Sequence, residues 1–135
     1  MVVLIDTNIF LEYLLAQERA DECLNALKAI IDANIDAVIS SFSLHSIEVI
    51  MMRNNLNEKL KEFLSVISEI QYIKVYNTSP EEDIEILGLM ENKKLDFDDS
   101  IQLYIAKKLN ALLLTLDKHF DNIKDIKVKK PWEII

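Results

Sequence analysis

The sequence has little cysteine, glycine or proline, and each shortage excludes a class of protein. Its single cysteine, Cys23, cannot form an internal disulfide, so a secreted domain held together by disulfides is excluded. One glycine and two prolines leave little room for long loops, and half of the residues are hydrophobic, which excludes a disordered chain. We expect residues 1–135 to form one packed domain with Cys23 in its core.

A membrane span and a targeting segment are also missing. No run approaches the roughly eighteen apolar residues that cross a bilayer. The N-terminus lacks the charged start and small-residue cleavage site of a signal peptide, and its apolar run stops at Asp6. These features predict a cytoplasmic protein with no membrane partner.

Acidic residues outnumber basic residues, 23 to 15. The net charge of −8 argues against a protein that holds nucleic acid mainly by a basic surface. A nuclease remains compatible with this charge, because carboxylates reach phosphate through bound cations. The lysines near the C-terminus either contact a nucleic-acid backbone or form a solvated face; they are Lys118, Lys124, Lys127, Lys129 and Lys130.

Strand and helix patterns alternate along the chain. Apolar or β-branched segments predict strands at 2–5, 36–40, 72–76 and 111–116, with 126–128 as a candidate edge strand. Helical periodicity and capping residues predict helices at 7–15, 19–33, 42–54, 57–69, 80–92 and 98–110. The alternation predicts an α/β fold with three α/β/α layers and a central, mainly parallel sheet of four to five strands.

Two aspartates follow buried strands in the same way. Asp6 comes directly after residues 2–5, and Asp117 directly after residues 112–116. Because ligands gather at the carboxyl ends of parallel strands, both carboxylates are expected on one rim of the sheet. Taken alone, Asp6 also fits the N-cap of the next helix, although Thr7 or Asn8 can serve as that cap instead.

Glu48 lies within the apolar stripe of the helix predicted at 42–54, close to Ile47 and Met51 around the helix. A surface glutamate would be expected on the side of Arg53. Burying an unpaired carboxylate is expensive, so this position suggests a role. Taken alone, Glu48 also fits a residue at the edge of the stripe.

Asp99 opens the largely apolar helix predicted at 98–110, after Asp96 and Asp98. One of these acids is expected to cap the helix, and Asp98 fits that role. Clustered carboxylates repel one another unless a cation neutralises them. Oxygen ligands suit Mg²⁺ or Mn²⁺, and there is no zinc pattern. The chemistry that such a site favours is metal-assisted attack of water on a phosphodiester.

The acids and their flanking residues resemble the four acidic motifs of PIN domains. The matching segments are Val3–Leu11, Glu48 on its helix, Asp99–Ala106 and Leu113–Phe120, which stand in the family's order and cover essentially the whole chain. The small single-domain form is similar to the VapC-type toxins of prokaryotic toxin–antitoxin pairs. The resemblance implies a Mg²⁺- or Mn²⁺-dependent endoribonuclease whose catalytic and metal-binding residues are Asp6, Glu48, Asp99 and Asp117.

The same resemblance implies supporting residues. Asn8 and Thr115 match polar positions of the family's active site, which would orient the acids or waters. In the third motif the acid precedes a small residue, which points to Asp99 rather than Asp98 as the ligand; Asp98 and Asp96 are then candidates for a supporting shell. Gln102 stands where the family often has a small apolar residue, so this helix face could alter dimer contacts or substrate access.

Partners follow from the resemblance as well. It implies an RNA substrate, a homodimer, and a small antitoxin whose tail enters the acidic groove. Three alternatives stay open: a stand-alone RNA-processing nuclease, a non-catalytic interaction module, and a phosphatase of the haloacid dehalogenase kind, whose motif requires a second Asp where Asn8 stands. Neither His45 nor His119 matches a catalytic position of the family, and both are expected to lie among residues that pack or cap.

Overall fold

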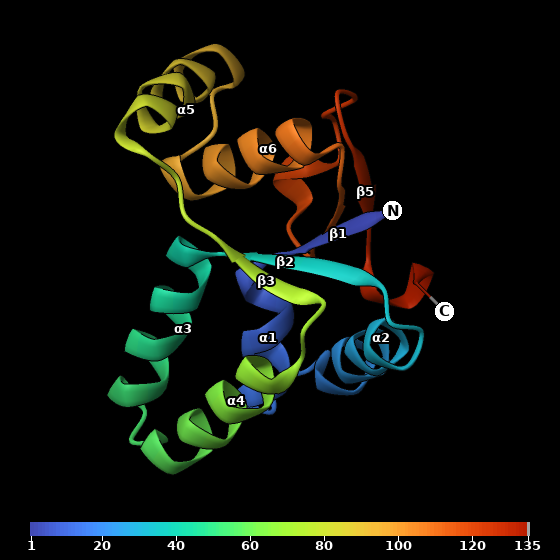
Figure 1. Ribbon diagram of the computed structural model, residues 1–135. Coiled ribbons are helices and arrows are strands. Elements are labelled where there is room, and N and C mark those ends of the chain that lie inside the picture. Colours follow the sequence, from blue (N-terminus) through green and yellow to red (C-terminus); the bar gives the residue numbers. More distant parts are fainter. Residues whose placement is uncertain (135) are drawn as a thin grey trace.

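Five short strands run in the same direction and form the central sheet of the molecule. The computed structural model describes residues 1–134 and confirms the α/β class, with a sheet that is parallel throughout. The strand order is β3-β2-β1-β4-β5 (Figure 1). The strands are β1 (Val2–Ile5), β2 (Asp36–Ser40), β3 (Ile73–Tyr76), β4 (Leu112–Leu114) and β5 (Lys127–Lys129).

Helices cover both faces of the sheet, as the three-layer prediction requires (Figure 1). One layer consists of α1 (Thr7–Leu14), α2 (Ala20–Asp32), α3 (Ser41–Arg53) and α4 (Asn57–Glu69). On the other face α6 (Phe97–Leu109) packs against the sheet, and α5 (Pro80–Lys93) packs against α6. Two short 3₁₀ turns follow β4 and β5, at Lys118–Phe120 and Pro131–Glu133.

The central strands β1 and β4 are buried on both sides. Val3 and Ile5 pack toward the layer of α1 to α4, whereas Leu4 packs toward α6, and all three are at most 1% exposed. Leu113 of β4 lies in the same core as Leu4. This two-sided burial explains why both strands read as continuous apolar runs, and each buried side chain contributes roughly 1.5–3 kcal/mol.

The structure corrects the predicted N-cap of α6 and decides between the candidate N-caps of α1. The N-cap of α6 is Asp96, which accepts a hydrogen bond from the Asp99 N–H at 2.9 Å, so the prediction that Asp98 is the cap was wrong. Asp96 stands three residues before Asp99, which is the spacing from an N-cap to its target amide. The N-cap of α1 is Asp6, which accepts from the Thr7 N–H, and not Thr7 or Asn8.

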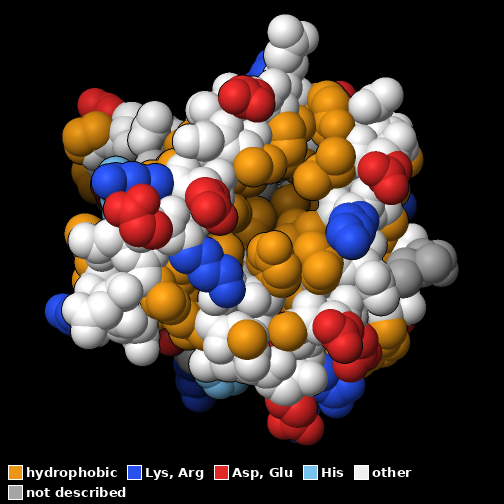
Figure 2. All heavy atoms as spheres, turned by 90° about the horizontal axis from the view of Figure 1, so that it is seen from below, with side chains coloured by type: hydrophobic (Ala, Val, Ile, Leu, Met, Phe, Trp, Pro, Cys, Tyr) orange, Lys and Arg blue, Asp and Glu red, His pale blue; other side chains and the backbone are white. Residues whose placement is uncertain are grey.

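The layer of α1, α2 and α4 contains an apolar hollow. A cavity of about 150 Å³ is lined by side chains of these helices, among them Phe10, Leu27 and Phe63. Figure 2 looks toward this layer and shows hydrophobic side chains gathered around a depression. Cys23 of α2 is buried in the core of the same layer, as predicted. Within residues 1–134, no helix combines the length and hydrophobicity needed to cross a bilayer.

Candidate metal centre

Side chains from three elements meet at the carboxyl edge of the sheet. Asp6 ends β1, Asp117 follows the neighbouring strand β4, and Asp99 lies in the first turn of α6. Because β1 and β4 pair in parallel register, the Asp6 N–H donates to the Leu114 carbonyl at 3.0 Å. The residues that follow the two strands, Asp6 and Asp117, therefore lie at the same edge of the sheet, and the N-terminus of α6 lies there as well.

Asp6 is buried and accepts four hydrogen bonds. Its Oδ1 accepts from the Thr7 N–H at 2.8 Å and from Gln102 Nε2 at 3.0 Å. Its Oδ2 accepts from the Thr115 hydroxyl at 2.7 Å and from Asn8 Nδ2 at 3.2 Å. Burial raises the pKa of Asp6, and the hydrogen bonds from Thr115, Thr7 and Gln102 act against that rise. These donors hold the carboxylate in one orientation.

Asn8 and Thr115, the predicted supporting residues, contact Asp6 and tie β1 to the segment after β4. Asn8 Oδ1 accepts from the Leu116 N–H at 3.1 Å. The Thr115 hydroxyl accepts from the Asp117 N–H at 2.9 Å. Thr115 thus links the side chain of one site aspartate to the backbone of another.

Gln102 enters the site from α6, a contact that the sequence did not indicate. Besides Asp6, its Nε2 donates to the Ser43 hydroxyl of α3 at 2.8 Å. The same hydroxyl accepts from Thr7 Oγ1 at 2.7 Å. Gln102 is only 3% exposed, so the residue expected to affect dimer contacts or substrate access instead points inward and positions Asp6.

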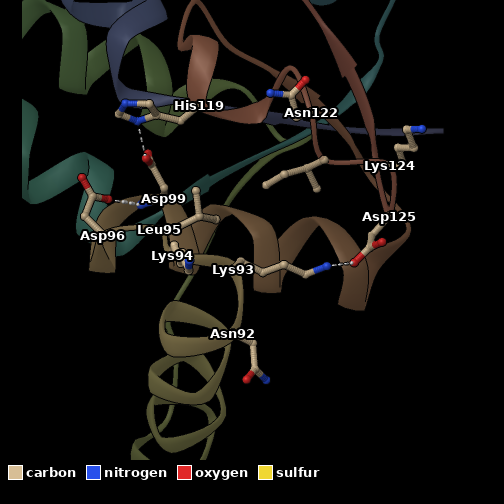
Figure 3. A pocket seen from close by; sticks show the side chains of 11 residues that line it. Asn92, Lys93, Lys94, Leu95, Asp96, Asp99, His119, Asn122, Lys124 and Asp125 are labelled. Carbon is tan, nitrogen blue, oxygen red and sulfur yellow. Dashed lines mark hydrogen bonds and ion pairs between the residues drawn. The ribbon is translucent and has the colours of Figure 1, made fainter.

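Asp99, Asp117 and His119 form a compact cluster of possible metal ligands. Each offers one ligand atom, and the three atoms lie within 4.8 Å of one another. His119 Nδ1 is 2.8 Å from Asp99 Oδ2, the contact drawn in Figure 3, and 3.2 Å from Asp117 Oδ1. Two carboxylates and an imidazole form a donor set that fits a divalent cation.

The electrostatics of the cluster reflect burial and mutual repulsion. Burial raises the pKa of Asp99 to about 6; the hydrogen bond with His119 opposes this rise, and the charge of Asp117 adds to it. The hydrogen bond to Asp99, together with the charge of Asp117, raises the pKa of His119. The contact with His119 therefore favours the ionised form of Asp99, and the two acids favour the protonated form of the imidazole.

His119, for which the sequence predicts no role, is brought to the acids by a local turn. Asp117 caps the 3₁₀ turn Lys118–Phe120 by accepting from the His119 N–H at 2.8 Å. Phe120 is fully buried in the core beside α6 and anchors the turn. A capping aspartate followed two residues later by histidine, and then by a buried aromatic residue, is the signal that could have identified it.

The structure does not bring Glu48 to this cluster. Glu48 Oε1 lies 3.0 Å from Nδ1 of His45, an exposed residue of the same helix. Glu48 is about 140° around α3 from Ser43, the residue through which α3 contacts the site. Among residues 1–134, no hydrogen bond or ion pair joins Glu48 to Asp6, Asp99 or Asp117.

Asp96 and Asp98, the predicted supporting acids, lie at the start of α6 and have different surroundings. Asp96 caps α6 and so fixes the backbone at Asp99. Asp98 is exposed in the first turn, where partial desolvation and the charges of Asp96 and Asp6 raise its pKa. Asp98 therefore adds a negative charge near Asp96 and Asp6 at the start of α6.

A groove leads away from the cluster. A cavity of about 730 Å³ has Asp99 and His119 at one end and continues between the end of α5 and the segment before β5 (Figure 3). Its charged lining is mixed, and the Nζ of Lys93 pairs with Asp125 at 3.1 Å. The other lining residues include Asn92, Lys94, Leu95, Asn122 and Lys124.

Comparisons with known proteins agree with this architecture. The family model for the PIN domain matches residues 3–126. A toxin–antitoxin complex from Klebsiella pneumoniae contains a chain of 25% sequence identity and TM-score 0.72, with 96% of this chain and 97% of that chain covered. A search among curated proteins finds no match.

Two more distant solved structures share the fold. VapBC2 from Rickettsia felis, bound to a fragment of promoter DNA, has 21% identity and TM-score 0.71, covering 96% of this chain and 98% of that one. VapC20 from Mycobacterium tuberculosis, described as a toxin that cleaves the sarcin–ricin loop, has 11% identity and TM-score 0.73, covering 94% and 98%. At these identities the likeness concerns the fold.

Asp99→Asn should stabilise the metal-free protein at neutral pH. Folding raises the pKa of Asp99 from 3.8 to about 6, so the folded protein favours the protonated carboxyl group. The contribution of this group to the free energy of unfolding is therefore fully present below pH 3.8 and is lost as the pH rises through about 6. In urea unfolding with EDTA, we expect the variant to exceed wild type by about 1–2 kcal/mol at pH 7 and to match it at pH 3.5.

Asp36→Asn is the matched control, because Asp36 is exposed at the amino end of β2. Its effect on the free energy of unfolding should be small and equal at both pH values. A loss of stability at pH 7 in Asp99→Asn would mean that the pairing with His119 outweighs the cost of burial.

Proposed function

The chain belongs to the PIN domain family, and from this premise we propose that it is a Mg²⁺- or Mn²⁺-dependent endoribonuclease, the toxin of a VapBC-type toxin–antitoxin pair. The observation that carries the proposal is the cluster of Asp99, Asp117 and His119 at the carboxyl edge of the sheet, next to Asp6. A family whose members are typically nucleases and a donor set suited to a divalent cation support the same activity.

The site aspartates divide the work in this proposal. A divalent cation at such a site activates water and neutralises phosphate charge. Asp99 and Asp117 supply the ligand oxygens, which lie close together. The carboxylate of Asp6 already accepts four hydrogen bonds, and these bonds hold together the segments that carry the other acids. Glu48 has a catalytic role only by family resemblance, since it would have to leave His45 to reach the cluster.

The groove beside the cluster is the proposed path for RNA. Lys94 and Lys124 line it, are exposed, and have no ion-pair partner within residues 1–134. Lys93 also lines it but is already paired with Asp125. Two free lysines along a groove that starts at the acidic centre would hold phosphates on one side of the cleaved bond, which lets a chain of net charge −8 bind RNA.

A small antitoxin is the proposed protein partner. Structures with the same fold were determined as toxin–antitoxin complexes, one from Klebsiella pneumoniae and one from Rickettsia felis. A basic segment of such a partner would complement the exposed acids at the start of α6, Asp96 and Asp98. The homodimer rests on resemblance to VapC-type toxins alone, and sedimentation of the purified chain tests it.

The main test removes one proposed ligand. We expect Asp117→Asn to lower RNA cleavage by roughly a hundredfold or more, because a lost ligand weakens metal binding. EDTA should abolish the cleavage, and Mg²⁺ or Mn²⁺ should restore it. The readout is cleavage-site mapping on total cellular RNA, with Asp36→Asn as a control of equal chemistry at the opposite edge of the sheet. Full activity in EDTA or in Asp117→Asn would reject the nuclease and favour a non-catalytic binding module.

Glu48→Gln should have a smaller effect than Asp117→Asn. Because Glu48 pairs with His45 and not with the cluster, we expect the same assay to show a loss of less than about tenfold. A loss equal to that of Asp117→Asn would return Glu48 to the catalytic set and imply that its side chain swings into the site.

Lys124→Glu should weaken RNA binding without changing the chemistry. Reversing the charge in the groove should raise KM several-fold at low salt and leave kcat nearly unchanged. Lys74→Glu is the control, because Lys74 is exposed on β3 at the far edge of the sheet. Equal effects of the two variants would mean that RNA responds to net charge and does not use this groove.

A further inference from the structure

His119 belongs to the site cluster through its geometry, and family resemblance assigns it no role. We propose that His119 is a metal ligand through Nδ1 and that it makes the site prefer Mn²⁺ over Mg²⁺. The inference rests on the proposed function, because it concerns the same metal centre. The carboxylates alone would accept either Mg²⁺ or Mn²⁺, whereas a nitrogen ligand favours Mn²⁺.

The donor spacing supports ligation. Adjacent ligands of an octahedral ion, at a metal–ligand distance of about 2.1 Å, are separated by about 3 Å. His119 Nδ1 lies 2.8 Å from Asp99 Oδ2 and 3.2 Å from Asp117 Oδ1. The nitrogen therefore already has the separation from both oxygens that neighbouring ligands of one ion require.

The turn that carries His119 is held in place. The backbone N–H of His119 donates to Asp117 Oδ1, and the Asp121 N–H donates to the Lys118 carbonyl at 3.0 Å. Lys130 Nζ donates to the carbonyl of Asp117 at 3.2 Å, and Phe120 anchors the turn in the core. The ring is thus presented to the acids by a fixed backbone, while the largely exposed side chain leaves its other nitrogen free to meet water.

The charge balance also favours imidazole at this position. Glu48 is the only acid on α3 and is paired with His45, so α3 brings no carboxylate to the cluster. Asp99, Asp117 and the neighbouring Asp6 already bring three carboxylates to this edge of the sheet. A neutral imidazole adds a donor without adding repulsion, whereas a further carboxylate would add it.

Nitrogen ligation has a consequence for metal choice. Mg²⁺ binds oxygen ligands and gives up its waters reluctantly, whereas first-row transition metals accept imidazole. A site with one nitrogen donor should therefore gain more affinity for Mn²⁺ than for Mg²⁺. The competing explanation is that protonated His119 only neutralises the two aspartates, in which case it would compete with any metal.

Calorimetric titration at pH 8 separates these explanations. We expect His119→Gln to weaken Mn²⁺ binding by about 10- to 100-fold and Mg²⁺ binding by less than about threefold. His119→Asp replaces nitrogen by oxygen and should bind both metals with a lower preference for Mn²⁺. His45→Gln, at the chain's other histidine, should leave both affinities unchanged.

Electron spin-echo spectra of the Mn²⁺-loaded protein give a second readout that does not depend on activity. Nitrogen coupling should be present in wild type and in His45→Gln, and absent in His119→Gln. The ligand role would be overturned if His119→Gln left the Mn²⁺ affinity unchanged, weakened the binding of both metals equally, or tightened the binding of both metals. Tighter binding would show that protonated His119 acts as a cation that competes with the metal.

Two outcomes separate the ligand role of His119 from the nuclease activity of the chain. If wild type shows nitrogen coupling to Mn²⁺ but does not cleave RNA, the ligand role stands and the nuclease does not. If wild type cleaves RNA with either metal and shows no nitrogen coupling, the nuclease stands and the ligand role does not.

Discussion

The hydrogen bonding of Asp6 is the constraint on which the site depends. A carboxylate buried at the end of a central strand is tolerated only when its oxygens are satisfied, and here donors come from α1, α6 and the segment after β4. The same contacts fix how these elements meet at the rim. Gln102 extends the network to Ser43 of α3, so one buried charge connects both helical layers across the edge of the sheet.

The neighbouring cluster is arranged differently. Asp99 is also buried, and burial raises its pKa to about 6, but its carboxylate contacts a histidine that is largely exposed. Asp6 is thus a satisfied charge, whereas Asp99 and Asp117 are acids brought together at a cost in stability that a cation would relieve. This contrast explains how one rim can contain both a rigid support and a site open to a ligand.

Patterns that reflect burial were readable from the sequence, whereas contacts between distant segments were not. The two-sided burial of β1 and β4 produces continuous apolar runs, and parallel pairing then places Asp6 and Asp117 on one rim. Composition and spacing do not reveal that Gln102 turns inward, because its partner Asp6 lies 96 residues away. His119 was missed for a related reason: its role depends on a turn whose capping residue is itself a site aspartate.

Glu48 illustrates the limit of helical periodicity. The apolar stripe of α3 includes Ile47 and Met51, and both lie in the core between the sheet and the layer of α1 to α4. Periodicity identifies the side of a helix that faces a core, but the candidate metal centre lies at the edge of the sheet, where α3 presents Ser43. A carboxylate beside the stripe can therefore be half-buried and still point away from the site. The third possible ligand beside Asp99 and Asp117 comes instead from the turn after β4, as His119, whereas α3 reaches the site only through Ser43.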